Sequence, residues 1–187
     1  MIRNPSLKFT SVISSRAISL LRNPHDHNTS TSALSRTVEA ATTLRDKALI
    51  EVLWSCGLRR SEIARLDVSD VNFSEGFLIV RTSKTGKPRI TPLSPSARHA
   101  LRKHIGKCSH GSLFDMTTNA IRLCLQRLGA PSAHAWRRGW AVQALRSGVS
   151  ETSVRAAAGW SSGAMVARYT RALSGELAVE EFQRSWN

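Results

Sequence analysis

Apolar residues between positions 43 and 57 recur at the spacing of one helical face. The positions on this face are Leu44, Ala48, Leu49, Val52 and Leu53. Because a helix turns about every 3.6 residues, this spacing predicts an amphipathic helix, and Gly57 supplies the expected stop. Beyond the turn, Ser61 is placed to cap a second short helix over residues 62–66.

Three short segments with strand patterns follow. Residues 71–73 are compatible with a short strand, 77–82 are apolar and β-branched, and 88–93 alternate between apolar and polar positions. Segment 83–87, with Gly86 in its turn, joins the last two as a hairpin. The pattern predicts a small antiparallel sheet whose hairpin tip exposes Lys84 and Lys87.

Helical patterns return after the sheet. The expected helices span residues 95–105, 119–128, 135–146 and 150–158, and each is followed by a glycine. Further helices are expected from Ser161 and from Ser174, the last of them amphipathic. The fold class predicted is α+β, mainly α-helical, with an antiparallel sheet of about three strands.

Residues 1–40 differ in composition from the rest of the chain. They are rich in Ser, Thr and Asn, and no acidic residue precedes Asp26. This composition resembles a mitochondrial transit peptide, and the competing interpretation is a basic linker or a domain remnant. Because the segment 24–35 has few apolar residues to bury, we predict a poorly structured linker over 1–40 and one folded domain over 41–187.

The charge of the chain is strongly positive. It has 27 Lys and Arg against 13 Asp and Glu, a formal net charge of +14, spread along its whole length. Such a domain suits a polyanion, and nucleic acid is the expected partner; a basic protein with no nucleic-acid role is the alternative. No apolar run is long enough to span a bilayer, and no secretory signal is present. These features predict a cytoplasmic protein without a membrane partner.

The three cysteines, Cys56, Cys108 and Cys124, form no CxxC pair, which indicates unpaired thiols in a reducing compartment. His104 and His110 lie close to Cys108, but no fourth ligand follows at a zinc-like spacing. We therefore predict no metal site.

Candidate chemistry centres on Tyr169, the single tyrosine of the chain, which is flanked by arginines. A surface tyrosine is the simplest interpretation, and a nucleophile beside a phosphate site is the alternative. His134 and Arg137 lie three positions apart at the start of a predicted helix, where free N–H groups and partial positive charge favour a phosphate. Arg59 lies between a helix stop and a new helix start, which fixes its backbone.

Residues of these types meet the needs of phosphoryl transfer through a protein nucleophile. Two arginine forks hold the charge of the phosphate. A tyrosine hydroxyl, whose ordinary pKa is about 10, needs a proton acceptor, and histidine is suited to that role. A lysine on a flexible hairpin is able to protonate the leaving oxygen, and an indole N–H is able to donate to the phosphate.

Five segments, in order, resemble the motifs of the tyrosine recombinases, the phage integrase family. The sequence G-L-R-R-S-E-I at 57–63 resembles the box T-G-L-R-x-S-E, with Cys56 in place of the usual small residue before the glycine. Lys84 matches the lysine of a β-hairpin in that family. The sequence H-A-W-R-R at 134–138 resembles the box H-x-L-R-H.

The last two motifs lie close together. The sequence A-G-W-S-S at 158–162 resembles L-G-H-S-S, with Trp160 in the place of the histidine, and Tyr169 follows nine residues later at the nucleophile position. The resemblance covers residues 40–187, the extent of the family's catalytic domain, and leaves the N-terminal helical domain of most relatives without a counterpart.

The resemblance implies the DNA breaking–rejoining fold and a site-specific recombinase or integrase that acts through a 3′-phosphotyrosyl intermediate. It assigns catalytic roles to Arg59, Lys84, His134, Arg137, Trp160 and Tyr169. It assigns a supporting role to Glu62, and we expect DNA contacts from Lys87, Arg89, Arg138 and Arg168. Lys84 and Lys87 remain alternatives as the general acid. No cofactor is expected, since the 5′-hydroxyl of a partner strand reverses the first step.

The partners implied are double-stranded DNA and further copies of the chain, joined on DNA through the C-terminal helix. The expected setting is the cytoplasm, in a bacterial, phage or plasmid context, and an organelle is the alternative. A second alternative is a truncated, non-catalytic DNA-binding remnant of an integrase that lacks the core-binding domain.

Overall fold

The computed structural model describes residues 31–81 and 88–164, and beyond them residues 166, 167, 175, 178, 179, 182, 183, 185 and 186. The predictions for residues 1–30, for the hairpin tip at 82–87 and for most of the chain after 164 lie outside the described residues.

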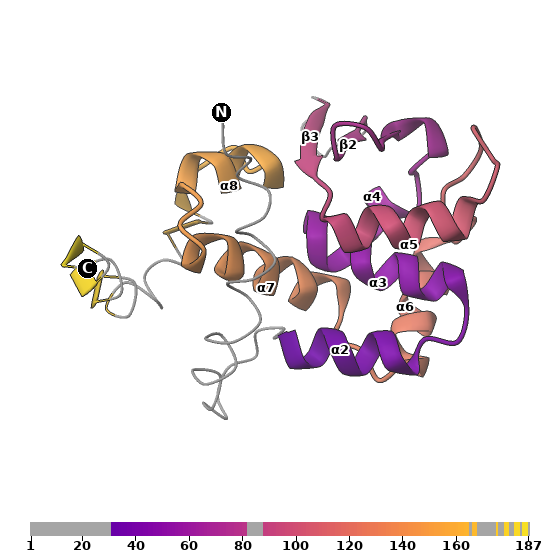
Figure 1. Ribbon diagram of the computed structural model, residues 1–187, viewed down its shortest axis with the longest axis horizontal. Helices are drawn as coiled ribbons and strands as arrows, with labels where there is room; N and C mark the ends of the chain where they lie inside the picture. The colour runs from indigo at the N-terminus through magenta and orange to yellow at the C-terminus, as the bar shows by residue number, and fades with distance from the viewer. Residues whose placement is uncertain are drawn as a thin grey trace, which may run out of the picture.

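The described chain is mostly helical with one small sheet (Figure 1). The helices are α2 (Thr31–Ala40), α3 (Leu44–Cys56), α4 (Arg60–Ile63), α5 (Pro95–Ile105), α6 (Thr118–Arg127), α7 (Ala133–Arg146) and α8 (Glu151–Ala158), with a 3-10 turn η2 (Val68–Asp70). The strands are β1 (Val71–Asn72), β2 (Phe77–Val80) and β3 (Arg89–Pro92). This arrangement confirms the predicted fold class.

The sheet has the order β1-β2-β3 and is antiparallel throughout. Leu78 and Val80 of β2 are buried, whereas Phe77 and Ile79 are half-buried, so one face of the strand is turned to the core. Val80 pairs with Arg89 at the end of the β2–β3 hairpin that adjoins its loop. The predicted hairpin is therefore confirmed in its two strands, and its tip with Lys84 and Lys87 lies outside the described residues.

Helix α3 is the centre of the main hydrophobic core. It contacts α2, α5 and α7, and Figure 1 shows it lying between α2 and α5. The apolar residues of α3 that are fully buried are Ala48, Leu49, Ile50, Val52, Leu53 and Cys56. Burial of each large aliphatic side chain contributes about 1.5–3 kcal/mol. The predicted helix is confirmed at both ends, since Thr43 caps it and Gly57 ends it in the left-handed conformation.

A second, smaller core lies between α7 and α8. Its buried members include Trp140 and Leu145 of α7, Val154 of α8, and Trp160. The two cores meet where the ring of Trp140 covers Gly57 at the end of α3. The motifs at 57–63, 134–138 and 158–162 all lie at this junction.

The prediction of a poorly structured linker over 1–40 is wrong for its last ten residues. Thr31–Ala40 forms α2, which packs on α3 with Leu34 and Val38 against the main core. Their helical spacing lies in a Ser- and Thr-rich stretch, and this apolar stripe is stable only because α3 covers it.

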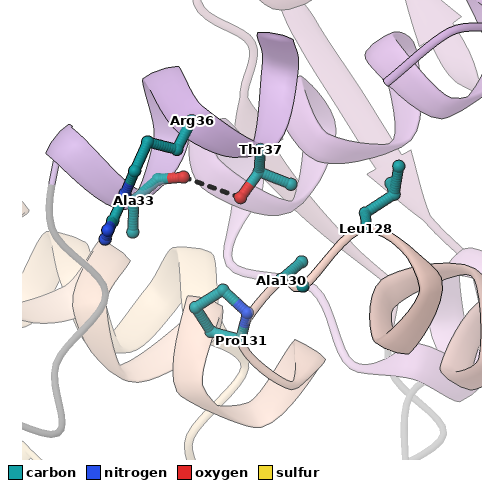
Figure 2. A pocket seen from close by; sticks show the side chains of 7 residues that line it. Ala33, Arg36, Thr37, Leu128, Ala130 and Pro131 are labelled. Atoms are coloured by element: carbon teal, nitrogen blue, oxygen red, sulfur yellow. Dashed lines mark hydrogen bonds between the residues drawn. The ribbon is translucent and has the colours of Figure 1, made fainter. Parts of the chain in front are cut away.

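A pocket of about 420 Å³ lies between α2 and the segment that precedes α7 (Figure 2). Its lining residues are Ala33, Arg36, Thr37, Leu128, Gly129, Ala130 and Pro131. The hydroxyl of Thr37 donates to the carbonyl of Ala33 at 2.7 Å, so that polar group is already satisfied within α2. None of the motif residues lines this pocket, and the candidate chemistry therefore lies elsewhere.

Two helices that carry candidate site residues begin two residues earlier than the sequence predicts. Helix α4 starts at Arg60 because the carboxylate of Glu62 accepts a hydrogen bond from the backbone N–H of Arg59 at 2.8 Å. Arg59, and not Ser61, is therefore the N-cap residue of this helix. Helix α7 starts at Ala133, capped by Ser132. His134 therefore lies in the first turn of α7.

Gly57 and Gly129 provide a matched pair for testing the junction of the two cores. Each follows a helix and has a positive φ, +57° and +61°, but a Cβ on Gly57 would lie 2.3 Å from the Trp140 ring, whereas nothing lies within 4 Å of one on Gly129. We expect Gly129→Ala to lower the free energy of unfolding by about 1 kcal/mol and Gly57→Ala by about 3 kcal/mol. Urea unfolding followed by tryptophan fluorescence measures both, and equal losses would rule out the ring contact as the cause.

None of the helices in the described ranges combines the length and apolar character needed to cross a bilayer.

Candidate active site

The candidate site forms where the ends of α3 and α8 meet the start of α7 and strand β3. The packing of α7 on α3, of α8 on α7 and of α8 on β3 brings these segments together. Figure 1 shows α8 above α7, with β3 to the right of α8. Residues that are far apart in the sequence thus become neighbours.

Arg137 is the buried centre of the site, only 4% exposed. Its Nη1 donates to the carbonyl of Gly57 and its Nη2 to the carbonyl of Ala158, each at 2.5 Å. Both acceptors lie at the C-terminal ends of helices, where carbonyl groups lack partners within the helix. One planar guanidinium therefore fixes the segment before Arg59 relative to the segment before Trp160.

Trp160 lies against Arg137. The Cζ atom of Arg137 is 5.1 Å from the centroid of the indole, a cation–π geometry. Trp160 is also buried in the core between α7 and α8. The structure thus places it both as a core residue and as the surface on which the arginine rests.

Arg59 and Glu62 form the second half of the site. The Nη1 atom of Arg59 donates to Oε1 of Glu62 at 2.8 Å, and the backbone N–H of Arg59 donates to Oε2. Burial favours a higher pKa for the Glu62 carboxyl, but hydrogen bonds from Arg89 and Arg59 outweigh burial and lower that pKa below its usual value. The side chain of Arg59 is 34% exposed, so an ionised Glu62 presents it toward solvent.

Arg89 is bonded within the protein. Its Nη1 and Nη2 donate to the two carboxylate oxygens of Glu62 at 2.9 and 2.8 Å, and its Nε donates to the carbonyl of Ala157 at 2.8 Å. The side chain is only 7% exposed. The nitrogen atoms of Arg89 are thus buried and bonded within the protein, and its contact with DNA stays a prediction.

The alternation along β3 contained part of this information. Arg89 and Thr91 share one face of the strand, and Ile90 lies on the other. Thr91 is buried and its hydroxyl donates to the carbonyl of Cys56 at 3.0 Å, whereas Ile90 is 58% exposed. Period-two alternation identifies which residues share a face, but here the polar face is the buried one.

His134 lies at the exposed edge of the site, in the first turn of α7. Partial burial lowers the pKa of its imidazole, and the positive charges of Arg138, Arg137 and Arg59 lower it further. All three guanidinium groups are thus close enough to act on the ring. The arrangement keeps His134 neutral, and therefore able to accept a proton, at pH 7.

This field on His134 is measurable. Followed by NMR, its imidazole is expected to titrate below 6.5, the ordinary value, because protonation adds a fourth positive charge to the cluster. Arg138→Gln should raise the midpoint, whereas Arg122→Gln on α6 should leave it unchanged. Since the folded-state pKa is the lower one, protonation disfavours the folded state, and stability falls as the pH drops through the ordinary value and toward the folded one. A midpoint at or above 6.5 would contradict the placement of the three guanidinium groups near His134.

The remaining predicted site residues lie outside the described residues. These are Lys84, Lys87, Arg168 and Tyr169. Among the residues that the structure describes, no three His, Cys, Asp or Glu side chains are grouped to share a metal ion. His104, next to the cysteine considered above, has its Nε2 2.8 Å from the carbonyl oxygen of Leu113 and stacks on Phe114.

Comparison with known proteins gives the same family as the motifs. Residues 26–176 match the model of the phage integrase family. Tyrosine recombinase XerC of Chromobacterium violaceum is 36% identical over 115 residues, which cover 60% of this chain and 38% of that protein. The match to the family model begins at residue 26, within the stretch predicted to be a linker.

Solved structures share the fold. The crystal structure of XerA recombinase matches with a TM-score of 0.70 and 24% identity, over 84% of this chain and 62% of that one. The integrase of transposon Tn1549, solved in complex with a circular intermediate DNA, matches with a TM-score of 0.63 and 18% identity, over 74% of this chain and 58% of that one. The aligned part of this chain thus spans well under half of the XerC relative and under two thirds of each structure.

Proposed function

The chain belongs to the phage integrase family, and from that premise we propose that it is a site-specific DNA recombinase that acts through a 3′-phosphotyrosyl intermediate. The observation that carries the proposal is the placement of Arg137. Its guanidinium is bonded to the carbonyls of Gly57 and Ala158 and lies on Trp160, while Arg59 and His134 lie in the same cluster. Two arginines beside a neutral histidine suit the attack of a hydroxyl on a phosphodiester.

The proposed first step transfers a phosphoryl group from DNA to the protein. The phenolic oxygen of Tyr169 attacks the phosphorus and passes its proton to His134. The bond from phosphorus to the 5′ oxygen breaks, and Lys84 (or Lys87) donates the proton that makes a 5′-hydroxyl. Arg59 and Arg137 stabilise the charge on the non-bridging oxygens. A 5′-hydroxyl from a partner strand then reverses the step, so the number of phosphodiester bonds is unchanged.

Double-stranded DNA is the proposed substrate. The Tn1549 integrase was solved with a circular intermediate DNA and the lambda integrase as a dimer bound to a core site. The net charge of +14 supports a polyanionic partner here. Arg138 is one of the three guanidinium groups that act on His134, and we assign it, with Lys87 and Arg168, to contacts with the phosphate backbone.

Assembly on DNA through the C-terminal segment is part of the proposal. Val179, Phe182 and Trp186 are apolar and are 56%, 62% and 77% exposed. Exposed apolar side chains clustered in one segment are typical of a surface that a partner covers. A second copy of the chain is the occupant proposed.

The test is the trapping of a covalent protein–DNA adduct. The full chain is incubated with duplexes that carry a nick and randomised sequence on both sides of it, so that cleavage near the nick releases a short fragment and prevents rejoining. We expect an adduct that survives denaturant, that mass spectrometry places on Tyr169, and that Tyr169→Phe abolishes. Sequencing of the trapped DNA then identifies the target site.

Two results would overturn the proposal in different ways. A chain that shifts the duplexes in a gel but forms no adduct would support the alternative, a non-catalytic DNA-binding remnant. An adduct that persists in Tyr169→Phe would show that another residue is the nucleophile.

A further inference from the structure

Arg89 connects three elements of the fold through one guanidinium group. It is the first residue of β3 and pairs with Val80 next to the loop of the hairpin. It donates two hydrogen bonds to Glu62, in the last turn of α4, and one to the carbonyl of Ala157, in the last turn of α8. The relative placement of β3, α4 and α8 is therefore determined at this side chain.

Each partner of Arg89 is itself bonded to, or adjoins, a residue of the candidate site. The carboxylate of Glu62 also accepts from Nη1 of Arg59 at 2.8 Å. The carbonyl of Ala158, next to that of Ala157, accepts from Arg137. Arg89 thus lies between the group that presents Arg59 and the helix end that receives Arg137.

The chain also leaves room for this guanidinium. Gly159 has a φ of +65°, and a Cβ at that position would lie 2.8 Å from Cδ of Arg89. The helix stop after α8 is thus compatible with a side chain of this length only when glycine occupies it. The absence of a side chain at Gly159, next to Trp160, thus leaves the space that the Arg89 side chain occupies.

A contribution to stability alone accounts poorly for these contacts. Desolvation of a buried ion pair often cancels its attraction, so such a pair is weak support for a stabilising role. What Arg89 adds is geometry, because a bidentate guanidinium fixes both the distance and the orientation of the carboxylate. With 7% of its side chain exposed, it acts through its neighbours.

We propose that Arg89 is a positioning residue that sets Arg59 and the end of α8 in their relative places; the inference rests on the recombinase function proposed above. Lysine at position 89 would keep the charge beside Glu62, but its single nitrogen has no fork with which to bond both carboxylate oxygens and the carbonyl of Ala157. The shape of the cation, and not its charge, is the feature that the proposal requires.

The first measurement is the rate of adduct formation at saturating nicked DNA, together with the affinity for the same DNA. For Arg89→Lys we expect a rate about tenfold lower and for Arg89→Met about a hundredfold lower, with the affinity within about twofold of the wild type. Arg98→Lys is the control, since Arg98 is half-buried against the turn at Gly76 and donates to the carbonyl of Phe73. Its rate should be that of the wild type.

The route through Glu62 is tested by combining substitutions. If Arg89 acts by holding Glu62, the Arg89→Met/Glu62→Gln double variant should cleave at about the rate of the slower single variant. Rate losses that multiply would overturn this route. Should Arg89→Met fail to fold, as judged by its melting curve, Arg89→Lys decides the question, and a wild-type rate in that variant overturns the proposal.

A second measurement needs no catalysis and therefore separates this proposal from the proposed function. In Arg89→Lys the NMR titration midpoint of His134 should rise, because Arg59 is no longer held near the ring although the total charge is unchanged. Arg98→Lys should not move it. If the wild type forms no adduct, the recombinase proposal fails, and this midpoint alone decides the role of Arg89: an unmoved midpoint overturns it.

Discussion

Arg137→Lys is expected to lower the rate of adduct formation by at least about a hundredfold at saturating DNA, although the charge of the protein is unchanged. The two carbonyls that Arg137 contacts, those of Gly57 and Ala158, belong to segments that are separated by most of the domain. A lysine ammonium has no planar fork and cannot bond both carbonyls in this geometry while resting on the indole of Trp160.

The loss should appear in the rate and not in the affinity for DNA. Arg137 is 4% exposed, so it contributes little to the first encounter with the backbone phosphates. Arg122→Lys on α6 is the matched control, because Arg122 is exposed and bonds Asn119 and Gln126 of its own helix. Adduct formation by Arg137→Lys at the control rate would show that the fork is not required.

Glu62→Gln is expected to lower the free energy of unfolding by about 3 kcal/mol near neutral pH, since it removes the charge that compensates a buried arginine. Arg89 donates two of its three hydrogen bonds to this carboxylate. Arg59 donates two more to it, one from its backbone N–H and one from its side chain. A neutral amide offers one acceptor oxygen and turns its NH₂ group toward cations that are themselves donors.

The pH dependence gives this prediction a second readout. The folded-state pKa of Glu62 lies below the ordinary 4.5, so its contribution is fully present above 4.5 and is lost as the pH falls through the folded-state value. The difference in stability between wild type and Glu62→Gln should therefore shrink in acid. Glu75→Gln, in the exposed turn before β2, is the control and should change stability by less than about 0.5 kcal/mol. A difference that stays constant down to pH 3 would contradict the assignment.

Local signals in the sequence predict much of this fold. The ends of α3, α5 and α8 follow from a capping side chain, Thr43, Ser94 or Ser150, and a glycine after the last turn. Such signals are short-range, so they survive without knowledge of the tertiary structure. Helix α2 escaped prediction because its stability depends on α3, which begins after it ends.

The sequence predicted which residues lie together at the site better than it predicted which atoms they contact. The motifs identify Arg59, His134, Arg137 and Trp160, which the structure brings together. The spacing of Arg137 and His134 does not predict that Arg137 is buried against two distant carbonyls. Helix periodicity gives the direction of a side chain, but not the group that it contacts. For the same reason, the bonds of Arg89 to Glu62 and to the carbonyl of Ala157 could not be predicted from the sequence.

The carbonyl oxygens that receive Arg137 are part of the backbone, and this affects how the site tolerates genetic change. A substitution at position 158 cannot delete the acceptor, whatever side chain it introduces. Ala158 is fully buried, so the limit at that position is volume. Replacements there should rank by size, with serine and glycine tolerated better than leucine or phenylalanine. Selection at position 158 therefore acts on the path of the backbone, because every residue there supplies the same carbonyl acceptor.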